Sequence, residues 1–514
     1  SKLFVNLCVI LFILISANDC SCLKILAVFP YNGRSHHILF SSLVEELSYR
    51  KHDVTVVNYF PVKKNPHLRQ ISIQYSDNKS DNINVEDHIK NLPSVFTNFY
   101  RAYDAVKAFR YMANINCQKL MTNKELQQII SSREKFDLII AEQFVTDCGL
   151  AIGYKLNAPT VGMTAHILMP WTYSRLGAPN NPAFVPNAFF FTGSRPNLWE
   201  KIQSAMINFG LNLYYRNVIQ KENQDIIHKT YPEVPELETL GRNISFIMVN
   251  QYFPLTGSRL YGVNVVEIGG MHINQEDLKL FLDNAKDGVV YISFGTVASH
   301  IPRHVINNII SLIERINMNF VWNIDNITEW DVPHNVLIKK WLPQLAILCH
   351  PNVLAFITHS GMLSTTEAMH CGVPIVSVPL FGDQLTNAAL AVESGLGVAV
   401  DILKLDDIAL EHALQTVLQK RYQDRANHLS NVWRDRPMTP METAVYWIEY
   451  AARYKGDIQM KPAMVDLPTY QYLLLDVYVI FVVFIVIISY LIIKILSCIL
   501  KMCKSNKLKK VKNE

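Results

Sequence analysis

Residues 341–384 read WLPQLAILCHPNVLAFITHSGMLSTTEAMHCGVPIVSVPLFGDQ. Val353 to Thr358 is an apolar run of the length of a buried parallel strand. His-Ser-Gly at 359–361 turns the chain, and we expect residues 364–367 (Ser-Thr-Thr-Glu) to begin a helix with capping hydroxyls and a Glu in its first turn. A second apolar run, Ile375 to Pro379, leads into Phe-Gly-Asp-Gln at 381–384. Strands that each lead into a turn and a helix favour a doubly wound α/β sheet.

The turn after the first strand is typical of an anion site. Free N–H groups and the dipole at a helix N-terminus favour phosphate, and the His and Ser side chains add donors. Glu367 is suited to a ribose diol, Asp383 and Gln384 to sugar hydroxyls, and Trp341 to a base, whose stacking is worth about 1–3 kcal/mol. Each residue alone also has a structural explanation, such as a core Trp or a plain turn. Their conjunction is what predicts a nucleotide diphosphate carrying a sugar.

The block as a whole resembles the signature of the UDP-glycosyltransferases, most closely the insect branch of the membrane-bound animal enzymes. The likeness covers nearly all 514 residues and includes the segments 33–40 (GRSHHILF), 181–186 (NPAFVP), 434–438 (RDRPM) and 470–477. It implies a GT-B fold, in which two Rossmann-like domains face a cleft, an inverting transfer, and no metal ion or other cofactor. One departure is Ser360, where the family commonly has Gly; a side chain there is tolerable if φ is negative.

The resemblance also implies roles for individual residues. His36 matches the base, and a neutral imidazole is suited to that task near neutral pH. Such a base usually needs an orienting carboxylate, for which we favour Glu142 over Asp147; the alternative role of Asp147 is helix capping. The residues expected to bind the UDP-sugar donor are Ser293, Thr296, Trp341, Gln344, His359, Gly361, Ser364, Glu367, Asp383 and Gln384.

We expect an enzyme that transfers a hexosyl group, with glucose favoured, to a small lipophilic hydroxylated acceptor. Vertebrate glucuronosyltransferases have an Arg at the position that matches Val249, and a buried sugar carboxylate without a cation would be costly. The alternatives are a UDP-glucuronosyltransferase and a non-catalytic lumenal protein that binds a nucleotide sugar or a lipophile. The sequence leaves open the acceptor, whether the product is an O- or a C-glycoside, and whether the chain forms a homo-oligomer.

The expected organisation is a signal peptide, an acceptor domain, a UDP-sugar domain, a linker, a membrane span and a basic tail. These segments cover residues 1–22, 23–254, 255–456, 457–472, 473–500 and 501–514, respectively. Apolar runs predict strands at 24–30, 53–59, 136–141, 160–163, 289–294, 320–324, 336–340, 354–358, 375–378 and 398–400. We expect the proline-rich loop 169–196 to line the acceptor pocket, and the last helices before residue 456 to return to the first half, as in the family.

Charge and hydropathy at the two ends predict the topology. Residues 477–493 carry no charge and reach about 26 Å as a helix. The tail that follows holds six lysines and one glutamate, which leaves the rest of the chain near neutral and gives no sign of nucleic-acid binding. Because basic residues stay cytosolic, we expect a single-pass type I protein with a lumenal body. Lys510 and Lys512 resemble a dilysine signal for the endoplasmic reticulum.

Other short signals fit a lumenal chain. Sequons at Asn78, Asn243 and Asn326 predict N-glycosylation. Four cysteines lie in the body, and because they show no CxxC and no disulfide framework we expect them to be mostly buried free thiols. They are Cys117, Cys148, Cys349 and Cys371.

Overall fold

The computed structural model describes residues 22–74, 97–132, 134–273, 282, 285, 288–295, 301–324, 333, 335–457 and 459–511. The chain divides into two compact units that meet between Lys461 and Pro462. The expected signal peptide therefore lies almost wholly outside the described residues, as do the sequons at Asn78 and Asn326 and the donor residue Thr296.

The larger unit holds two parallel sheets. The first has seven described strands in the order β3-β2-β1-β4-β5-β6-β7, and its central strands are apolar and buried on both faces, as parallel sheets require. The strands are β1 Lys24–Val28, β2 Asp53–Asn58, β3 Leu68–Ser72, β4 Leu138–Glu142, β5 Thr160–Thr164, β6 Ile247–Val249 and β7 Val265–Glu267.

The second sheet has six described strands in the order β10-β9-β8-β11-β12-β13. They are β8 Val289–Ser293, β9 Asn319–Asn323, β10 Val336–Lys339, β11 Val353–Thr358, β12 Ile375–Ser377 and β13 Gly397–Ala399. In each sheet the chain order reverses beside a central strand, next to β1 in the first and next to β8 in the second. Ligands of such sheets bind at the carboxyl ends of the strands near this reversal.

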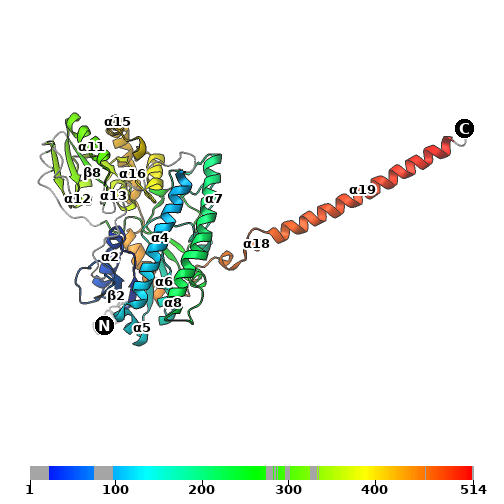
Figure 1. Cartoon of the computed structure of the whole chain (residues 1–514), viewed down its shortest axis with the longest axis horizontal. Coiled ribbons are helices and arrows are strands. Elements are labelled where there is room, and N and C mark those ends of the chain that lie inside the picture. Colours follow the sequence, from blue (N-terminus) through cyan, green and yellow to red (C-terminus); the bar gives the residue numbers. More distant parts are fainter. Residues whose placement is uncertain are drawn as a thin grey trace, which may run out of the picture. The chain divides into compact units, whose positions relative to one another are not determined.

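Helices cover both sheets. Those of the first half are α2 Arg34–Tyr49, α4 Thr97–Thr122, α5 Lys124–Ser132, α6 Cys148–Leu156, α7 Leu198–Tyr214, α8 Lys221–His228, α9 Leu237–Arg242 and α10 Phe253–Thr256. Those of the second half are α11 Arg303–Arg315, α12 Gln344–Leu348, α13 Met362–Cys371, α14 Gln384–Ser394, α15 Asp407–Val417 and α16 Lys420–Arg434. Figure 1 shows the long helices α4 and α7 running side by side, and residues of the two helices are in contact.

The last helix of the larger unit, α17 (Pro440–Arg453), returns to the first half, as expected. Its buried side chains, including Val445 and Ile448, share an apolar core with Leu39 and Leu43 of α2. The boundary between the halves differs from the expected one at residue 254, because β7 extends the first sheet to Glu267. A strand of three residues is too short to give a periodic signal.

The expectation of free thiols in the body is wrong. Cys117 of α4 is bonded to Cys148 of α6, and Cys349, which follows α12, is bonded to Cys371 at the end of α13. The bonded residues are 31 and 22 positions apart in the sequence, so the pairing depends on how the helices pack. Disulfides persist in oxidising compartments, which fits a lumenal body.

The smaller unit contains a 3₁₀ turn at Ala463–Asp466, α18 (Thr469–Tyr472) and the long helix α19 (Leu475–Val511). Residues Leu475–Cys498 of α19 have a mean hydropathy of 3.1 and are long and apolar enough to cross a membrane. This segment lies within the expected span 473–500 and is consistent with a single-pass anchor.

Candidate functional site

His36 lies in the first turn of α2, and Glu142 is the last residue of β4. Because β1 and β4 are parallel neighbours, the chain that leaves β1 toward α2 passes the end of β4. His36 Nδ1 lies 2.6 Å from Glu142 Oε1, and the backbone N–H of Tyr31 donates to Glu142 Oε2 at 3.2 Å. Both side chains are buried. With Nδ1–H donated to the carboxylate, Nε2 is the nitrogen left to accept a proton.

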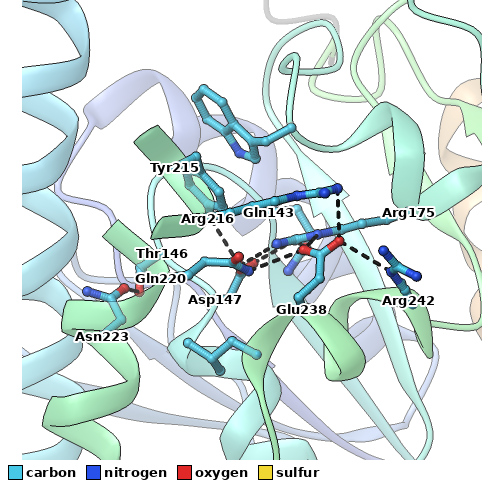
Figure 2. A network of polar contacts seen from close by, with 12 residues as sticks. Gln143, Thr146, Asp147, Arg175, Tyr215, Arg216, Gln220, Asn223, Glu238 and Arg242 are labelled. Atoms are coloured by element: carbon cyan, nitrogen blue, oxygen red, sulfur yellow. Dashed lines mark hydrogen bonds and ion pairs between the residues drawn. The ribbon is translucent and has the colours of Figure 1, made fainter. Parts of the chain in front are cut away.

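Asp147, the alternative to Glu142 as the orienting carboxylate, forms its hydrogen bonds with other residues. Figure 2 shows its carboxylate facing Arg175, which donates from Nη1 at 2.9 Å and from Nη2 at 2.7 Å. Tyr215 and Gln220 donate to the same carboxylate, and Glu238 accepts from Arg175 at 3.0 Å. The two acidic partners keep the pKa of the buried Arg175 well above its usual range despite the cost of burial. Asp147 sits at the N-cap position of α6, but its side chain makes no capping hydrogen bond.

An aromatic wall surrounds His36. The rings of Tyr31 and Phe144 lie 4.5 and 5.1 Å from it, centroid to centroid, and His166 lies at 5.6 Å. His166 Nδ1 donates to the carbonyl of Ile167 at 2.6 Å. Burial, together with the nearby His36, lowers the pKa of His166 to about 3, so this imidazole is neutral near pH 7. Sequence reasoning missed His166; the only signal was its position just past the end of a predicted strand.

The expected phosphate turn follows β11. His359 is buried, and its ring fits between Gly295 and Gly361: a Cβ on either glycine would lie 2.6 Å from the imidazole. Burial lowers the pKa of His359 to about 4, so it is neutral near pH 7. Ser360 has a φ of +61°, so the condition of a negative φ, under which a side chain is readily tolerated here, is not met. The left-handed conformation explains why glycine is common at this position in the family that the sequence resembles.

Helix α13 begins earlier than the sequence suggested. It starts at Met362, its N-cap is Gly361, and no side chain caps it. The expected start at Ser364 and the placement of Glu367 in the first turn were therefore wrong, because glycine at the N-cap leaves no side-chain signal to read. The uncapped N–H groups of the first turn remain available to an anion.

Glu367 belongs to a small polar cluster with three other residues. Gln344, the first residue of α12, donates to Glu367 Oε2 at 2.8 Å and to Ser364 Oγ at 3.0 Å. His272 Nε2 lies 3.1 Å from Glu367 Oε1. Three of the expected donor-binding residues thus lie together, and His272 is a neighbour that sequence reasoning missed.

Asp383 is the N-cap residue of α14, and Gln384 is the first residue of that helix. Gln384 Oε1 accepts from the backbone N–H groups of Leu380 and Phe381, so this side chain fixes its own loop. Asp383 is half-buried, and desolvation raises the pKa of its carboxyl group. Asn387 Nδ2 donates to Asp383 Oδ2 at 3.1 Å.

A cavity of about 1720 Å³ joins these groups. Its walls come from both halves of the larger unit, with His36, His166 and the aromatic wall on one side and the cluster around Glu367 on the other. The expected donor residues that line it are Ser293, Trp341, Gln344, His359, Gly361, Ser364, Glu367, Asp383 and Gln384. Trp341 lines this cavity and is 63% exposed. The loop 169–196 contributes Met169 and Phe189.

Val249 does not line the cavity in which the donor sugar is expected to bind. Its side chain is fully buried in an apolar cluster with Ala141, Leu150 and Ile247. Among the described residues that line the cavity, none comes from β6. The residue at this position therefore carries no information on the donor sugar in this chain.

Two further expectations are neither confirmed nor contradicted. Asn243 is exposed at the end of α9, and its glycosylation stays a prediction. Among the described residues no three His, Cys, Asp or Glu side chains gather at a spacing suited to a metal ion. Independence from metal ions stays a prediction as well.

Comparisons with known proteins agree with the resemblance seen in the sequence. The family described as "UDP-glucoronosyl and UDP-glucosyl transferase" matches residues 24–512. UDP-glucosyltransferase 2 of Dactylopius coccus is 32% identical over 472 residues, which is 88% of both chains. UDP-glucuronosyltransferase 1A1 of Mus musculus is 27% identical over 88% of this chain and 86% of its own.

Solved structures share the fold. A glycotransferase of kitacinnamycin superposes with a TM-score of 0.55 and 16% identity over 82% of this chain and 97% of its own. A UDP-glucosyltransferase from Polygonum tinctorium superposes with a TM-score of 0.53 and 13% identity, covering 84% and 98%. These two likenesses support the GT-B architecture of paired Rossmann-like domains. With its family match across nearly the whole length, the chain belongs to the UDP-glycosyltransferases.

Proposed function

We propose that this UDP-glycosyltransferase moves a glucosyl group from UDP-glucose to a hydroxyl group of a small lipophilic acceptor. In this proposal His36 is the general base and Glu142 orients it. The observation that carries it is the 2.6 Å contact between Glu142 Oε1 and Nδ1 of His36, a residue that lines the large cavity. A buried carboxylate on one nitrogen holds the ring in the tautomer that has its other nitrogen free for catalysis.

The chemistry follows from that tautomer. His36 Nε2 takes the proton of the acceptor hydroxyl while its oxygen bonds to the anomeric carbon, and the bond from that carbon to the UDP oxygen breaks. UDP leaves with the electron pair. In this proposal, neutral His359, Ser364 and the N–H groups at the start of α13 stabilise the diphosphate charge. Aromatic residues around His36 suit an apolar acceptor, and attack from the face opposite UDP inverts the anomeric carbon.

Glucose is favoured as the donor sugar on two grounds. Asp383 lies in the cavity, and its carboxylate suits neutral hydroxyls and repels a second carboxylate. The relative from Dactylopius coccus is named a UDP-glucosyltransferase. Glucuronate is the second candidate, because the mouse relative is named a UDP-glucuronosyltransferase.

We also propose that the protein is a single-pass type I protein of the endoplasmic reticulum membrane with its catalytic body in the lumen. The candidate span in α19 and the lysines that follow it support this orientation. The two disulfides of the body suit an oxidising lumen.

The test is transfer by full-length protein in its native membranes. Membranes would receive UDP-glucose or UDP-glucuronate with a mixed panel of phenols, anthraquinones, flavonoids and steroids, and mass spectrometry would identify products. A glucoside that is absent from membranes carrying His36→Ala is the expected result. Binding of UDP without transfer of either sugar would instead favour a non-catalytic binding protein.

A further inference from the structure

The segment 268–272 connects the first sheet to the second half of the larger unit, and its backbone is fixed to the first half. The N–H of Ile268 donates to the carbonyl of Val249 at 2.9 Å, and that of Gly269 donates to Gln251 at 3.0 Å. The packing at Gly269 is so close that a Cβ there would lie 2.6 Å from the carbonyl carbon of Gln251. His272 is therefore carried by a segment whose position is set by the first sheet.

The side chain of His272 reaches the second half. Its Nε2 lies 3.1 Å from Oε1 of Glu367 on α13, and only 2% of the His272 side chain is exposed. The other ring nitrogen, Nδ1, is buried and has no hydrogen-bond partner among the described residues. The carboxylate is thus the polar group that holds this imidazole, with Nε2–H as the donor.

Glu367 is held from two directions. His272 donates to Oε1, and Gln344 donates to Oε2 at 2.8 Å. A carboxylate offers about four lone-pair sites, so two donors fix its orientation and leave acceptor capacity on both oxygens. A vicinal diol presents two donors at a spacing that matches the two oxygens of one carboxylate.

We propose that His272 is a positioning residue for nucleotide recognition: it holds the Glu367 carboxylate in the orientation that accepts hydrogen bonds from the two ribose hydroxyls of the UDP-sugar. The inference rests on the proposed function, transfer from a UDP-sugar, together with the role that the sequence predicts for Glu367, which is binding of the ribose. It adds that the ribose site is completed by the first half of the larger unit, through a residue of the connecting segment. Loss of the contact between His272 and Glu367 should weaken binding of the ribose hydroxyls more than binding of the base or the diphosphate.

The experiment compares the dissociation constants of UDP and 2′,3′-dideoxy-UDP for the purified full chain by calorimetry. The dissociation constant of dideoxy-UDP divided by that of UDP reports recognition of the ribose hydroxyls. In His272→Ala we expect this ratio to fall at least fivefold toward unity. The dissociation constant of dideoxy-UDP itself should stay within about twofold of its value for the unchanged protein. His272→Gln should keep most of the ratio, because its amide N–H can donate to the same carboxylate oxygen.

The matched control is His350→Ala. As whole residues, His350 and His272 are both 9% exposed. His350 Nδ1, however, accepts from the backbone N–H of Asn352, whereas His272 contacts Glu367. This variant should leave both dissociation constants unchanged. If it lowers the ratio as His272→Ala does, the effect reflects loss of any buried imidazole and the proposal is wrong.

Glu367→Gln separates the inference from the function on which it rests. A ratio that falls in Glu367→Gln but not in His272→Ala overturns the role of His272 and leaves Glu367 as a ribose ligand. A ratio that is unchanged in Glu367→Gln overturns both assignments. Equal weakening of UDP and dideoxy-UDP in His272→Ala would show a general structural role and also contradict the proposal.

Discussion

His36 Nδ1 and Glu142 Oε1 lie 2.6 Å apart, although 106 positions separate the two residues in the sequence. The parallel pairing of β1 with β4 produces this contact, because it brings the start of α2 to the end of β4. Tyr31 donates to the second carboxylate oxygen, so the acid is held from two sides. The fold itself therefore brings together the proposed base and the carboxylate proposed to orient it.

The first prediction concerns the base. His36→Ala should lower turnover by at least ~10²-fold, since loss of a general base typically costs 10² to 10⁴. The dissociation constant of UDP should stay within about twofold, because His36 lies on the wall that the first half provides. Steady-state rates with a weakly acidic alcohol, together with UDP calorimetry, provide the check. Unchanged turnover with that acceptor would contradict the assignment; an ionised phenol is unsuitable because it needs no base.

The second prediction separates the two carboxylates. Glu142→Gln should lower turnover about as much as His36→Ala, with little loss of stability. Asp147→Asn should instead lower the thermal midpoint, because removing one partner of a buried ion pair typically costs about 3–5 kcal/mol. Turnover per folded molecule should change little in Asp147→Asn. The opposite pattern, with Asp147→Asn inactive and fully stable, would make Asp147 the functional acid.

Much of the second sheet could be predicted from the sequence, and the reason is local. Val289–Ser293 and Val353–Thr358 are continuous apolar runs, and both were expected to within one residue at each end. Leu68–Ser72 was missed because LRQIS is an edge strand with polar positions. Val265–Glu267, an edge strand of three residues, was also missed.

The site was only partly predictable. His359, Glu367 and Asp383 are close in sequence and carry a signature, whereas His166 and His272 contribute through packing alone. The disulfide Cys117–Cys148 and the positive φ of Ser360 also depend on tertiary structure, which no spacing in the sequence specifies.

The third prediction uses pH. Burial lowers the pKa of His166 to about 3, whereas it is about 6.5 in an unfolded chain. Below pH 6.5 the unfolded state therefore binds a proton that the folded state does not, and stability falls as the pH drops toward 3. The slope from this residue is about 1.4 kcal/mol per pH unit. In denaturant titrations between pH 4 and 6, His166→Phe should show a shallower decline than the unchanged protein. Identical slopes would mean that His166 is not buried in the neutral form.

The fourth prediction tests the phosphate turn. Ser360 has a φ of +61°, and its buried hydroxyl has no partner among the described residues. Ser360→Gly removes the steric cost of a Cβ in the left-handed region, about 1–2 kcal/mol, against about 0.5–1 kcal/mol of added backbone entropy in the unfolded chain. The unfolding free energy should stay equal or rise by up to about 1.5 kcal/mol, and UDP binding should be kept. Thermal melts with and without UDP measure both quantities; a clear loss of stability would contradict this account of the turn.

The fifth prediction concerns the donor sugar. UDP-glucose should exceed UDP-glucuronate in transfer efficiency by more than tenfold, about 1.4 kcal/mol in transition-state terms, because a C6 carboxylate would meet Asp383 in the cavity. Asp383→Asn removes that charge and also weakens hydrogen bonding to neutral hydroxyls. The transfer efficiency with UDP-glucose divided by that with UDP-glucuronate should therefore fall at least threefold. Asp406→Asn, at an exposed helix N-cap, is the matched control and should leave the ratio unchanged. Val249→Arg is expected to destabilise an apolar cluster rather than to alter the donor, since that side chain is fully buried. Competition between the two donors for one acceptor in one enzyme preparation measures the ratio directly, and equal use of the donors, or a preference for glucuronate, would overturn the assignment of glucose.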